Sequence, residues 1–218
     1  MIWIFGDSFS VPFETHINNK CDWAIDYCNF KKKIPKVFGN VLSDLLKMNV
    51  TNLAIPGCDN YTMFHSYIKN IENIKKNDIV IFGWSNTLRY RLGNDFNKFT
   101  TIIIEWDEKK ISKEFSNLSK NTLNELLMIR NSLAYYDELK EFIKIIKYSL
   151  PNNLIYNWSP FLDVRKNVSD LENIIPPSGI NIETNGLVND YHYGEIAHLN
   201  LAMYFYKKIK SKKDGNTI

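Results

Sequence analysis

A short apolar run at residues 2–5 (IWIF) ends abruptly at a Gly-Asp-Ser sequence at residues 6–8, and this feature constrains the fold more than any other. Continuous apolar residues bounded by glycine are typical of a strand buried on both faces, as in a parallel sheet. The glycine allows a sharp turn after the strand. An acid and a hydroxyl then stand at the carboxyl end of the strand, the edge where open α/β sheets bind ligands. The opening residues therefore predict an α/β protein with polar groups at a functional edge.

Strand-like and helix-like patterns alternate along the rest of the chain. Short apolar runs predict further strands at 50–55, 78–83 and 154–158. Apolar residues at helical spacing predict helices at 36–48, 60–75, about 118–149 and 194–210. This alternation is typical of a parallel sheet with helices on both faces, so we expect an α/β fold.

Some stretches interrupt this alternation. The 11–35 segment lacks clean periodicity and is interpreted as an irregular insertion, and the segment from about 93 to 117 is interpreted as an elaboration. Within the latter, residues 100–106 are strongly β-forming and predict an added strand or hairpin arm. Residues 159–189 are loop-like, with turn residues. No repeat or linker divides the chain, so we expect one domain over 1–218 with insertions at about 11–35 and 93–117.

The composition limits the kinds of partner. With 44% hydrophobic residues in a chain of 218, a sizeable core can form. The net charge is only +3, and the basic clusters at 31–33 and 207–213 lack interleaved aromatic residues, so we expect no nucleic-acid partner. No apolar stretch is long enough to span a membrane. No basic leader precedes the run at 2–5, so we expect a cytoplasmic protein.

The cysteines give no indication of a metal site. Cys21, Cys28 and Cys58 do not have the spacing of metal ligands, so we expect no metal ion. Their odd number is typical of a reduced chain, in line with the expected cytoplasmic location, and a Cys21–Cys28 pair stays open.

Four polar segments stand at the ends of predicted strands or at the start of the last helix. They are Gly6-Asp7-Ser8, residues 52–57 ending in Gly57, residues 83–86 ending in Asn86, and Asp190-Tyr191-His192. In a parallel sheet these points gather at one edge. Together they supply a hydroxyl, a glycine N–H, a carboxamide, an imidazole and a carboxylate, which are the groups that acyl transfer requires.

This constellation resembles the SGNH (GDSL-type) hydrolase family, which is named after four residues in four sequence blocks. The matching residues are Ser8, Gly57, Asn86 and His192, in blocks at 5–10, 52–60, 80–86 and 190–202. The blocks extend over most of the chain and follow the family's order. The resemblance implies a three-layer α/β/α sandwich with a mostly parallel, flavodoxin-like sheet, in agreement with the alternating pattern.

The resemblance also implies a role for each matched residue. Ser8 is the nucleophile, His192 is the general base, and Asp190 orients His192. The oxyanion hole consists of the backbone N–H groups of Ser8 and Gly57 and the side-chain amide of Asn86. No metal ion or organic cofactor is implied. The implied activity is that of a serine esterase.

The acid is displaced from its usual place in the family. It commonly stands three residues before the histidine, where this chain has Asn189, whereas Asp190 is only two residues before His192. A related group of acyl-transferring enzymes shares the two-residue spacing, so Asp190 is the expected partner. Glu195 and His198 mimic the family's spacing, but a histidine inside the last helix would lie too far from the loop edge. We therefore expect His198 to be a packing residue or a neighbour of the site.

Each matched residue also has a purely structural explanation. Ser8 suits a helix cap, Gly57 suits a tight turn, and Asn86 suits a loop. One shared site explains their joint occurrence better than separate coincidences do. Local or structural roles are expected for Asp7, which would fix the turn by hydrogen bonds, and for His16 and His65, at the surface or in the interior.

Aromatic residues and arginines near the blocks suggest a class of substrate. Trp84 and Arg89, in and after the third block, are the expected substrate-binding residues. Aromatic residues of the 11–35 insertion are expected to wall the site: Phe13, Trp23, Tyr27 and Phe30. Such surfaces suit a carbohydrate ester at least as well as a lipid, and family analogy favours short, acetyl esters. We expect a small-molecule or carbohydrate ester as substrate; nothing in the sequence indicates an oligomeric state.

Two other functions stay open. The same triad would transfer the acyl group to a sugar hydroxyl in an O-acyltransferase, which needs an alcohol acceptor. The same fold would also serve as a non-catalytic carbohydrate-binding module, whose glycan binding would not depend on Ser8.

Overall fold

A computed structural model describes residues 1–86, 89–92, 100–103, 134–174 and 179–215 of the chain. Its centre is a four-stranded sheet in the order β2-β1-β3-β6, and every strand pair in it is parallel. The strands are β1 (Ile2–Gly6), β2 (Val50–Asn52), β3 (Ile79–Gly83) and β6 (Leu154–Trp158). They correspond to the four apolar runs, so the predicted parallel sheet is confirmed.

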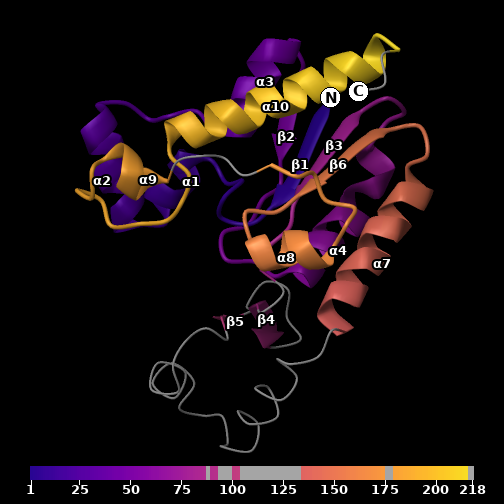
Figure 1. The fold of residues 1–218 in the computed structure, drawn as a ribbon, viewed down its shortest axis with the longest axis horizontal. Coiled ribbons are helices and arrows are strands. Elements are labelled where there is room, and N and C mark those ends of the chain that lie inside the picture. Colours follow the sequence, from indigo (N-terminus) through magenta and orange to yellow (C-terminus); the bar gives the residue numbers. More distant parts are fainter. Residues whose placement is uncertain (87–88, 93–99, 104–133, 175–178, 216–218) are drawn as a thin grey trace, which may run out of the picture.

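Helices cover both faces of this sheet (Figure 1). One face carries α3 (Phe38–Leu46) and α10 (Glu195–Lys213). The other carries α4 (Asn60–Asn70), which runs into a short 3-10 helix (Ile71–Asn73), together with α7 (Ala134–Ser149) and α8 (Leu162–Asn167). The protein is therefore an α/β sandwich, as predicted from the alternating pattern.

Alternation along the central strands produces these two cores. Ile2 and Ile4 of β1 pack with α3 and α10, whereas Trp3 and Phe5 pack with α4 and α7. The same alternation continues in β3, where the Phe82 ring stacks on Phe5 at 5.0 Å between ring centres. Since β1 and β3 are buried at every position, they have an apolar residue at each position before the terminal glycine.

The strand order places a topological switch point between β1 and β3. From β1 the chain passes through α3 to β2 at the edge of the sheet. It then returns through α4 to β3, which lies on the other side of β1. The helix that leads into β2 from β1 (α3) and the helix that leads into β6 from β3 (α7) lie on opposite faces of the sheet. In open α/β sheets, ligands bind at such a switch point, at the carboxyl ends of the strands.

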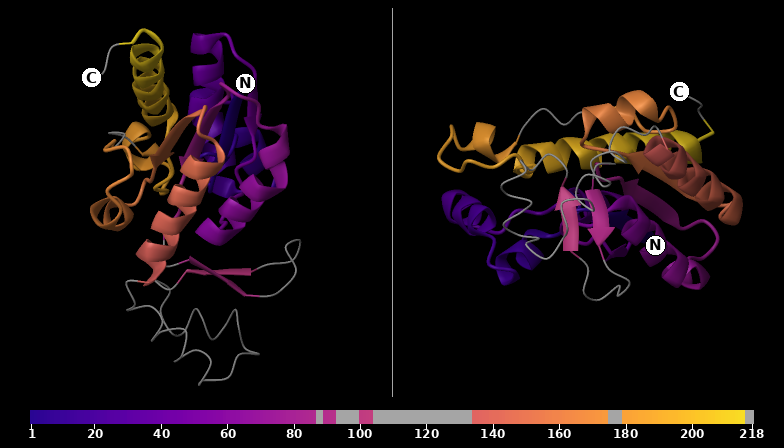
Figure 2. Two further views of the ribbon diagram at one scale, coloured as in Figure 1. Left: turned by 90° about the vertical axis from the view of Figure 1, so that its right-hand side faces the viewer. Right: turned by 90° about the horizontal axis from the view of Figure 1, so that it is seen from below.

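The 11–35 segment differs from its prediction as an irregular insertion. It forms two short helices, α1 (Phe13–Asn18) and α2 (Asp22–Lys31). These helices pack with α9 (Ile180–Glu183) around a small separate core. The three helices gather at one end of the molecule, beyond the carboxyl ends of the strands (Figures 1 and 2). Residues 159–189, expected to be loop-like, likewise contain α8 and α9.

The second insertion lies largely outside the described residues. Its described part, β5 (Thr100–Ile103), pairs antiparallel with β4 (Arg89–Leu92), which confirms the expected hairpin arm. The rest of the 93–117 segment, and the first half of the helix predicted from about 118, also lie outside the described part. No helix among the described residues is long and apolar enough to cross a membrane.

Partly buried and exposed polar contacts fasten α2 to α9 and to the start of α10. The Tyr27 hydroxyl donates to Glu183 Oε2 at 2.6 Å and accepts from the backbone N–H of Glu195 at 2.7 Å. The other carboxylate oxygen of Glu183 accepts from the N–H of Ile196 at 3.0 Å. Lys31 Nζ lies 2.8 Å from the Glu195 carboxylate. We call these contacts the Tyr27 clamp.

A histidine occupies the interior next to this clamp. His198 of α10 is 3% exposed, and its ring lies among those of Phe13, Phe38 and Tyr193. It is a packing residue, one of the two roles expected for it. Burial, and secondarily the nearby imidazoles of His192 and His16, lower its pKa to about 3.

This histidine predicts a pH dependence of stability. In the unfolded chain a histidine binds its proton below about pH 6.5. Folded His198 stays neutral down to about pH 3, so the free energy of unfolding decreases as the pH falls between these values. We expect the His198→Leu variant to show a shallower dependence, by up to ~1.4 kcal/mol per pH unit, in urea denaturation at each pH. His65→Leu is the control; equal slopes in His198→Leu and wild type would contradict the prediction.

Candidate active site

Ser8 lies in a tight turn directly after β1. The buried Asp7 carboxylate accepts a hydrogen bond from the N–H of Phe9 at 3.1 Å. The backbone carbonyl of Asp7 accepts another from the N–H of Ser10 at 2.9 Å. Asp7 therefore fixes the turn by local hydrogen bonds, as predicted. Ser8 itself is half-buried at the carboxyl edge of the sheet.

Two glycines allow this turn to fold back over the sheet. Gly6 pairs with Gly83, so β1 and β3 end at the same level. A Cβ atom at Gly6 or Gly83 would lie 2.3 or 2.5 Å from Ser10 Oγ, which is too close for any side chain. The missing side chains thus make room for Ser10, and this holds the Ser8 turn against the ends of both strands.

His16 of α1 reaches this turn from the insertion. Its ring atom Nε2 lies 3.1 Å from the carbonyl oxygen of Ser8. His16 is buried, and this burial, more than any other influence, lowers the pKa of its imidazole. A neutral imidazole that bonds a carbonyl must carry its proton on the bonding nitrogen, so His16 donates from Nε2.

Asp190 and His192 form a hydrogen-bonded pair in the loop before α10. Asp190 Oδ1 lies 2.6 Å from His192 Nδ1 and accepts from the backbone N–H of His192 at 2.7 Å. Partial burial alone raises the pKa of Asp190, but the hydrogen bonds from His192 outweigh it and hold this pKa below its usual value. The two-residue spacing thus brings this acid to Nδ1, as the expected role requires.

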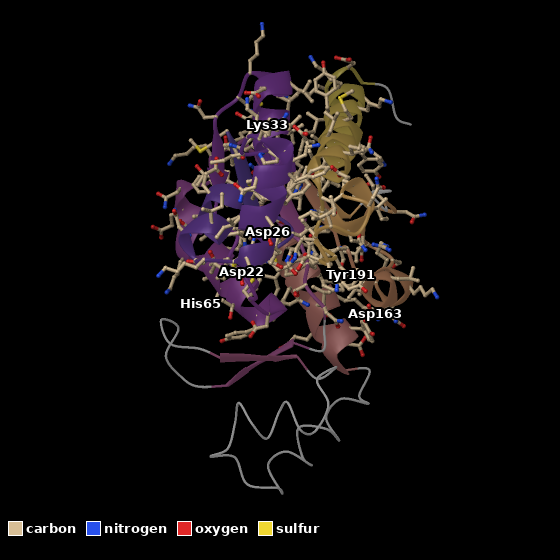
Figure 3. The ribbon with its side chains drawn as sticks, turned by 90° about the vertical axis from the view of Figure 1, so that its left-hand side faces the viewer. Asp22, Asp26, Lys33, His65, Asp163 and Tyr191 are labelled. Carbon is tan, nitrogen blue, oxygen red and sulfur yellow. The ribbon has the colours of Figure 1, made fainter. Side chains whose placement is uncertain are left out.

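The start of α9 fixes the position of this histidine loop, residues 190–193. The backbone N–H of Ile180 donates to the carbonyl of His192 at 2.9 Å, and that of Asn181 donates to the carbonyl of Asp190 at 3.2 Å. Figure 3 looks onto the end of the molecule that carries α1, α2 and α9. In this view Asp22 of α2 lies to the left and Tyr191 of the histidine loop lies to the right.

The His192 ring is held between two aromatic rings. Trp23 of α2 stacks on one side at 4.3 Å with an interplanar angle of 3°, and Phe9 stacks at 4.9 Å with an angle of 27°. The Nε2 atom is buried and has no hydrogen-bond partner within the described part of the chain. Ser8 Oγ therefore does not bond Nε2 in this conformation, although Phe9, the next residue, touches the ring.

The segment that carries Gly57 runs beside the end of β1. The N–H of Ile55 donates to the carbonyl of Gly6 at 2.9 Å, and Cys58 Sγ contacts the same carbonyl at 3.4 Å. Gly57 lies between them with φ of +72°, a conformation that favours glycine. The turn after β2 is thus placed next to the Ser8 turn.

Asn86 approaches the same edge from β3. The side chain of Asn60, at the start of α4, accepts from the N–H of Ser85 at 2.8 Å and donates to the carbonyl of Ser85 at 3.2 Å. These two bonds fasten the Asn86 loop to the segment after Gly57. The candidate oxyanion donors Ser8, Gly57 and Asn86 therefore follow three adjacent strands.

The two expected substrate-binding residues are not part of the described site. Trp84 is fully buried, stacks on Phe82 at 4.9 Å and donates from Nε1 to Asn157 Oδ1 at 2.9 Å. It presents no surface to a substrate, contrary to the expectation, because it continues the inward alternation of β3. Arg89 begins β4, and its side chain lies outside the described residues.

The aromatic residues of the insertion take different positions. Only Trp23 contacts His192, whereas Phe13 and Tyr27 are buried in the small core and Phe30 is 45% exposed. The insertion also supplies His16, for which the sequence suggested only a surface or structural place. One feature of the sequence could have indicated this position for His16. Phe13 stands three residues earlier, and residues at this spacing share one face of a helix, here the buried face of α1.

The alternative acid–base pair does not form. The Glu195 carboxylate lies 2.8 Å from Lys31 Nζ and 2.5 Å from Lys33 Nζ, in the region of the Tyr27 clamp. Among the described residues, no group of histidine, cysteine, aspartate and glutamate side chains has the arrangement of a metal site. Cys21, Cys28 and Cys58 form no disulfide bond with one another.

A search of protein-family models, curated proteins and solved structures finds no match to this chain. The function is therefore inferred from the site itself: a serine turn, an aspartate–histidine pair and two further loops at the switch point of a parallel sheet.

The Asp190–His192 pair predicts how an Asp190→Asn variant responds to acid. A pKa below the usual value means that the carboxylate stabilises the fold above about pH 4, and that this stabilisation is lost as the pH falls through the lowered pKa. At pH 7 we expect Asp190→Asn to be less stable than wild type, with the difference shrinking below about pH 4. Urea denaturation from pH 7 to pH 2 measures this, with the exposed Asp137→Asn as control. A difference that is constant across this range would contradict the prediction.

Proposed function

We propose that this protein is a serine esterase that hydrolyses short-chain esters, above all acetyl esters, of small molecules or carbohydrates. The observation that carries the proposal is the 2.6 Å hydrogen bond between Asp190 Oδ1 and His192 Nδ1, beside the turn that carries Ser8. This bond holds the proton on Nδ1 and leaves the lone pair on Nε2, which is the tautomer that a general base needs. The buried Nε2 has no competing partner among the described residues.

The proposed reaction proceeds through an acyl-enzyme. Ser8 Oγ bonds to the carbonyl carbon of the ester while its proton passes to His192 Nε2. The tetrahedral intermediate then collapses, the bond to the alcohol oxygen breaks, and His192 returns the proton to that oxygen. Water then adds to the acyl carbon while its proton passes to the same nitrogen, the bond to Ser8 Oγ breaks, and His192 returns the proton to Ser8 Oγ as the acid leaves. The approach of Ser8 Oγ to Nε2 belongs to this mechanism, since catalytic hydrogen bonds commonly shorten when substrate binds.

The charge of the intermediate requires donors on the opposite side of the carbonyl. The backbone N–H groups of Ser8 and Gly57 and the side-chain amide of Asn86 are the proposed donors. Their loops are fixed in advance by the contacts of Ile55 with Gly6 and of Asn60 with Ser85. Such preorganised donors need no rearrangement as the charge develops.

An O-acyltransferase is the second candidate. Its first half-reaction is the same, and a sugar hydroxyl then replaces water as the acceptor. The two-residue spacing of Asp190 and His192, which resembles that of acyl-transferring enzymes, favours it.

Ester hydrolysis tests the proposal directly. We expect wild type to release p-nitrophenol from p-nitrophenyl acetate faster than from longer acyl esters, and Ser8→Ala to show only background rates because it lacks the nucleophile. Ser169→Ala, at an exposed serine, is the matched control. Added sugar or alcohol acceptors separate the two candidates, since only a transferase gives more acylated acceptor than hydrolysed acid. Equal rates in wild type and Ser8→Ala would overturn the proposal.

The oxyanion donor gives a graded prediction. We expect Asn86→Ala to lower kcat by on the order of 10²–10³-fold with little change in KM, because this donor acts mainly on the intermediate. The same steady-state assay measures it, with folding checked by circular dichroism. A kcat close to that of wild type would remove Asn86 from the site.

A further inference from the structure

The α1–α2 segment touches both reacting residues of the proposed site. His16 of α1 bonds the Ser8 carbonyl, and Trp23 of α2 stacks on the His192 ring. We propose that this segment completes the active site, with His16 as a positioning residue for the nucleophile and Trp23 as a positioning residue for the base. This proposal rests on the proposed esterase function and assigns a role to an insertion that the matched blocks do not include.

The Ser8–Phe9 peptide shows how His16 acts. The N–H end of this peptide donates to the Asp7 carboxylate at 3.1 Å, and its carbonyl end lies 3.1 Å from His16 Nε2. With both ends held, the peptide plane cannot rotate, and this fixes the backbone from which the Ser8 side chain projects. Without His16 only the Asp7 bond would hold the plane.

The protonation state of His16 suits this role. As a neutral Nε2–H donor it holds the carbonyl without adding charge near His192, whose ring centre lies 5.8 Å away. Burial lowers the pKa of His16, and the imidazole of His192 lowers it further, while Asp190 and the Ser8 carbonyl act in the opposite direction. A neutral neighbour leaves His192 free to become an imidazolium during acyl transfer.

Trp23 acts on the base in a complementary way. Its indole lies parallel to the imidazole, at 4.3 Å and 3°, and Phe9 lies near the other face. Stacking from both sides prevents the ring from tilting away from the plane in which Nδ1 meets Asp190. An indole face also attracts a cation, so the stacking favours the imidazolium that forms when Ser8 gives up its proton.

The Tyr27 clamp explains how a short insertion can hold such positions. Tyr27 stands one helical turn after Trp23 on α2, and its hydroxyl joins Glu183 of α9 to the first N–H of α10. The same α9 anchors the histidine loop through Ile180. The segment that contacts the base and the loop that carries the base are thus fastened to one another.

Substitutions at His16 separate positioning from packing. His16→Gln keeps a donor that can reach the Ser8 carbonyl, whereas His16→Phe keeps the bulk and removes the donor. We expect His16→Phe to lower kcat for p-nitrophenyl acetate about 10- to 100-fold with KM nearly unchanged, and His16→Gln to recover most of this loss. His65→Phe, on α4, is the control and should match wild type.

Substitutions at Trp23 test the base in the same assay. We expect Trp23→Leu to lower kcat about 10- to 100-fold and to shift the acidic limb of the pH profile of kcat/KM downward, since the imidazolium loses its aromatic face. Trp23→Phe should restore most of both. Phe30→Leu, at an exposed aromatic residue of the same helix, should change neither.

The outcomes distinguish this proposal from the function on which it rests. Wild-type turnover equal to that of Ser8→Ala overturns the esterase and the positioning roles together. Turnover in wild type that persists at full kcat in folded His16→Phe and Trp23→Leu overturns only the positioning roles. Nitrogen NMR of the imidazoles gives a readout that does not need activity: at pH 7 the proton of His16 is expected on Nε2, and a proton on Nδ1 would contradict the bond to Ser8.

Discussion

The level pairing of β1 with β3 is the constraint on which the candidate site depends. Gly6 stands opposite Gly83, so both strands end together, and neither position has room for a side chain beneath Ser10. The connections after β1 and β3 place α3 and α7 on opposite faces of the sheet, so the position between the two strands is a topological switch point, where such sheets bind ligands. The nucleophile of the proposed site follows one strand and a proposed oxyanion donor follows the other, so the chemistry is set by the register of the sheet.

The central strands and the long helices could be predicted from the sequence because the residues that they bury recur in local apolar patterns. Residues 2–5 and 79–82 are apolar at consecutive positions, which is typical of a strand covered on both faces. The last helix has 19 residues and buries one apolar stripe along its length. Its prediction therefore depends on the whole stripe and not on the residues at its ends. The contact of Asp190 with His192 could also be predicted from the sequence. An aspartate two residues before a histidine can accept hydrogen bonds from both the backbone N–H and the ring of that histidine.

Other parts of the site depend on contacts between distant segments and leave little local trace. The α1 and α2 helices are short, and their order comes from the small core with α9 and from the Tyr27 clamp, so no strong periodicity marks them. His16 and Trp23 acquire their places only through this packing. Trp84 shows the opposite case: it was expected to bind substrate, yet it lies two residues after Phe82, and the period-two alternation of a strand accounts for its inward side chain.

Covalent labelling of the serine tests the central claim most directly. A fluorophosphonate reacts with a serine hydroxyl only when a base activates it, so the native protein can be treated with this probe, digested and mapped by mass spectrometry. Phosphonylation of Ser8 in wild type, and its loss in His192→Ala, is the result expected if Ser8, His192 and Asp190 act as one unit. An unmodified Ser8 in the folded wild-type protein would contradict a catalytic site at this edge of the sheet.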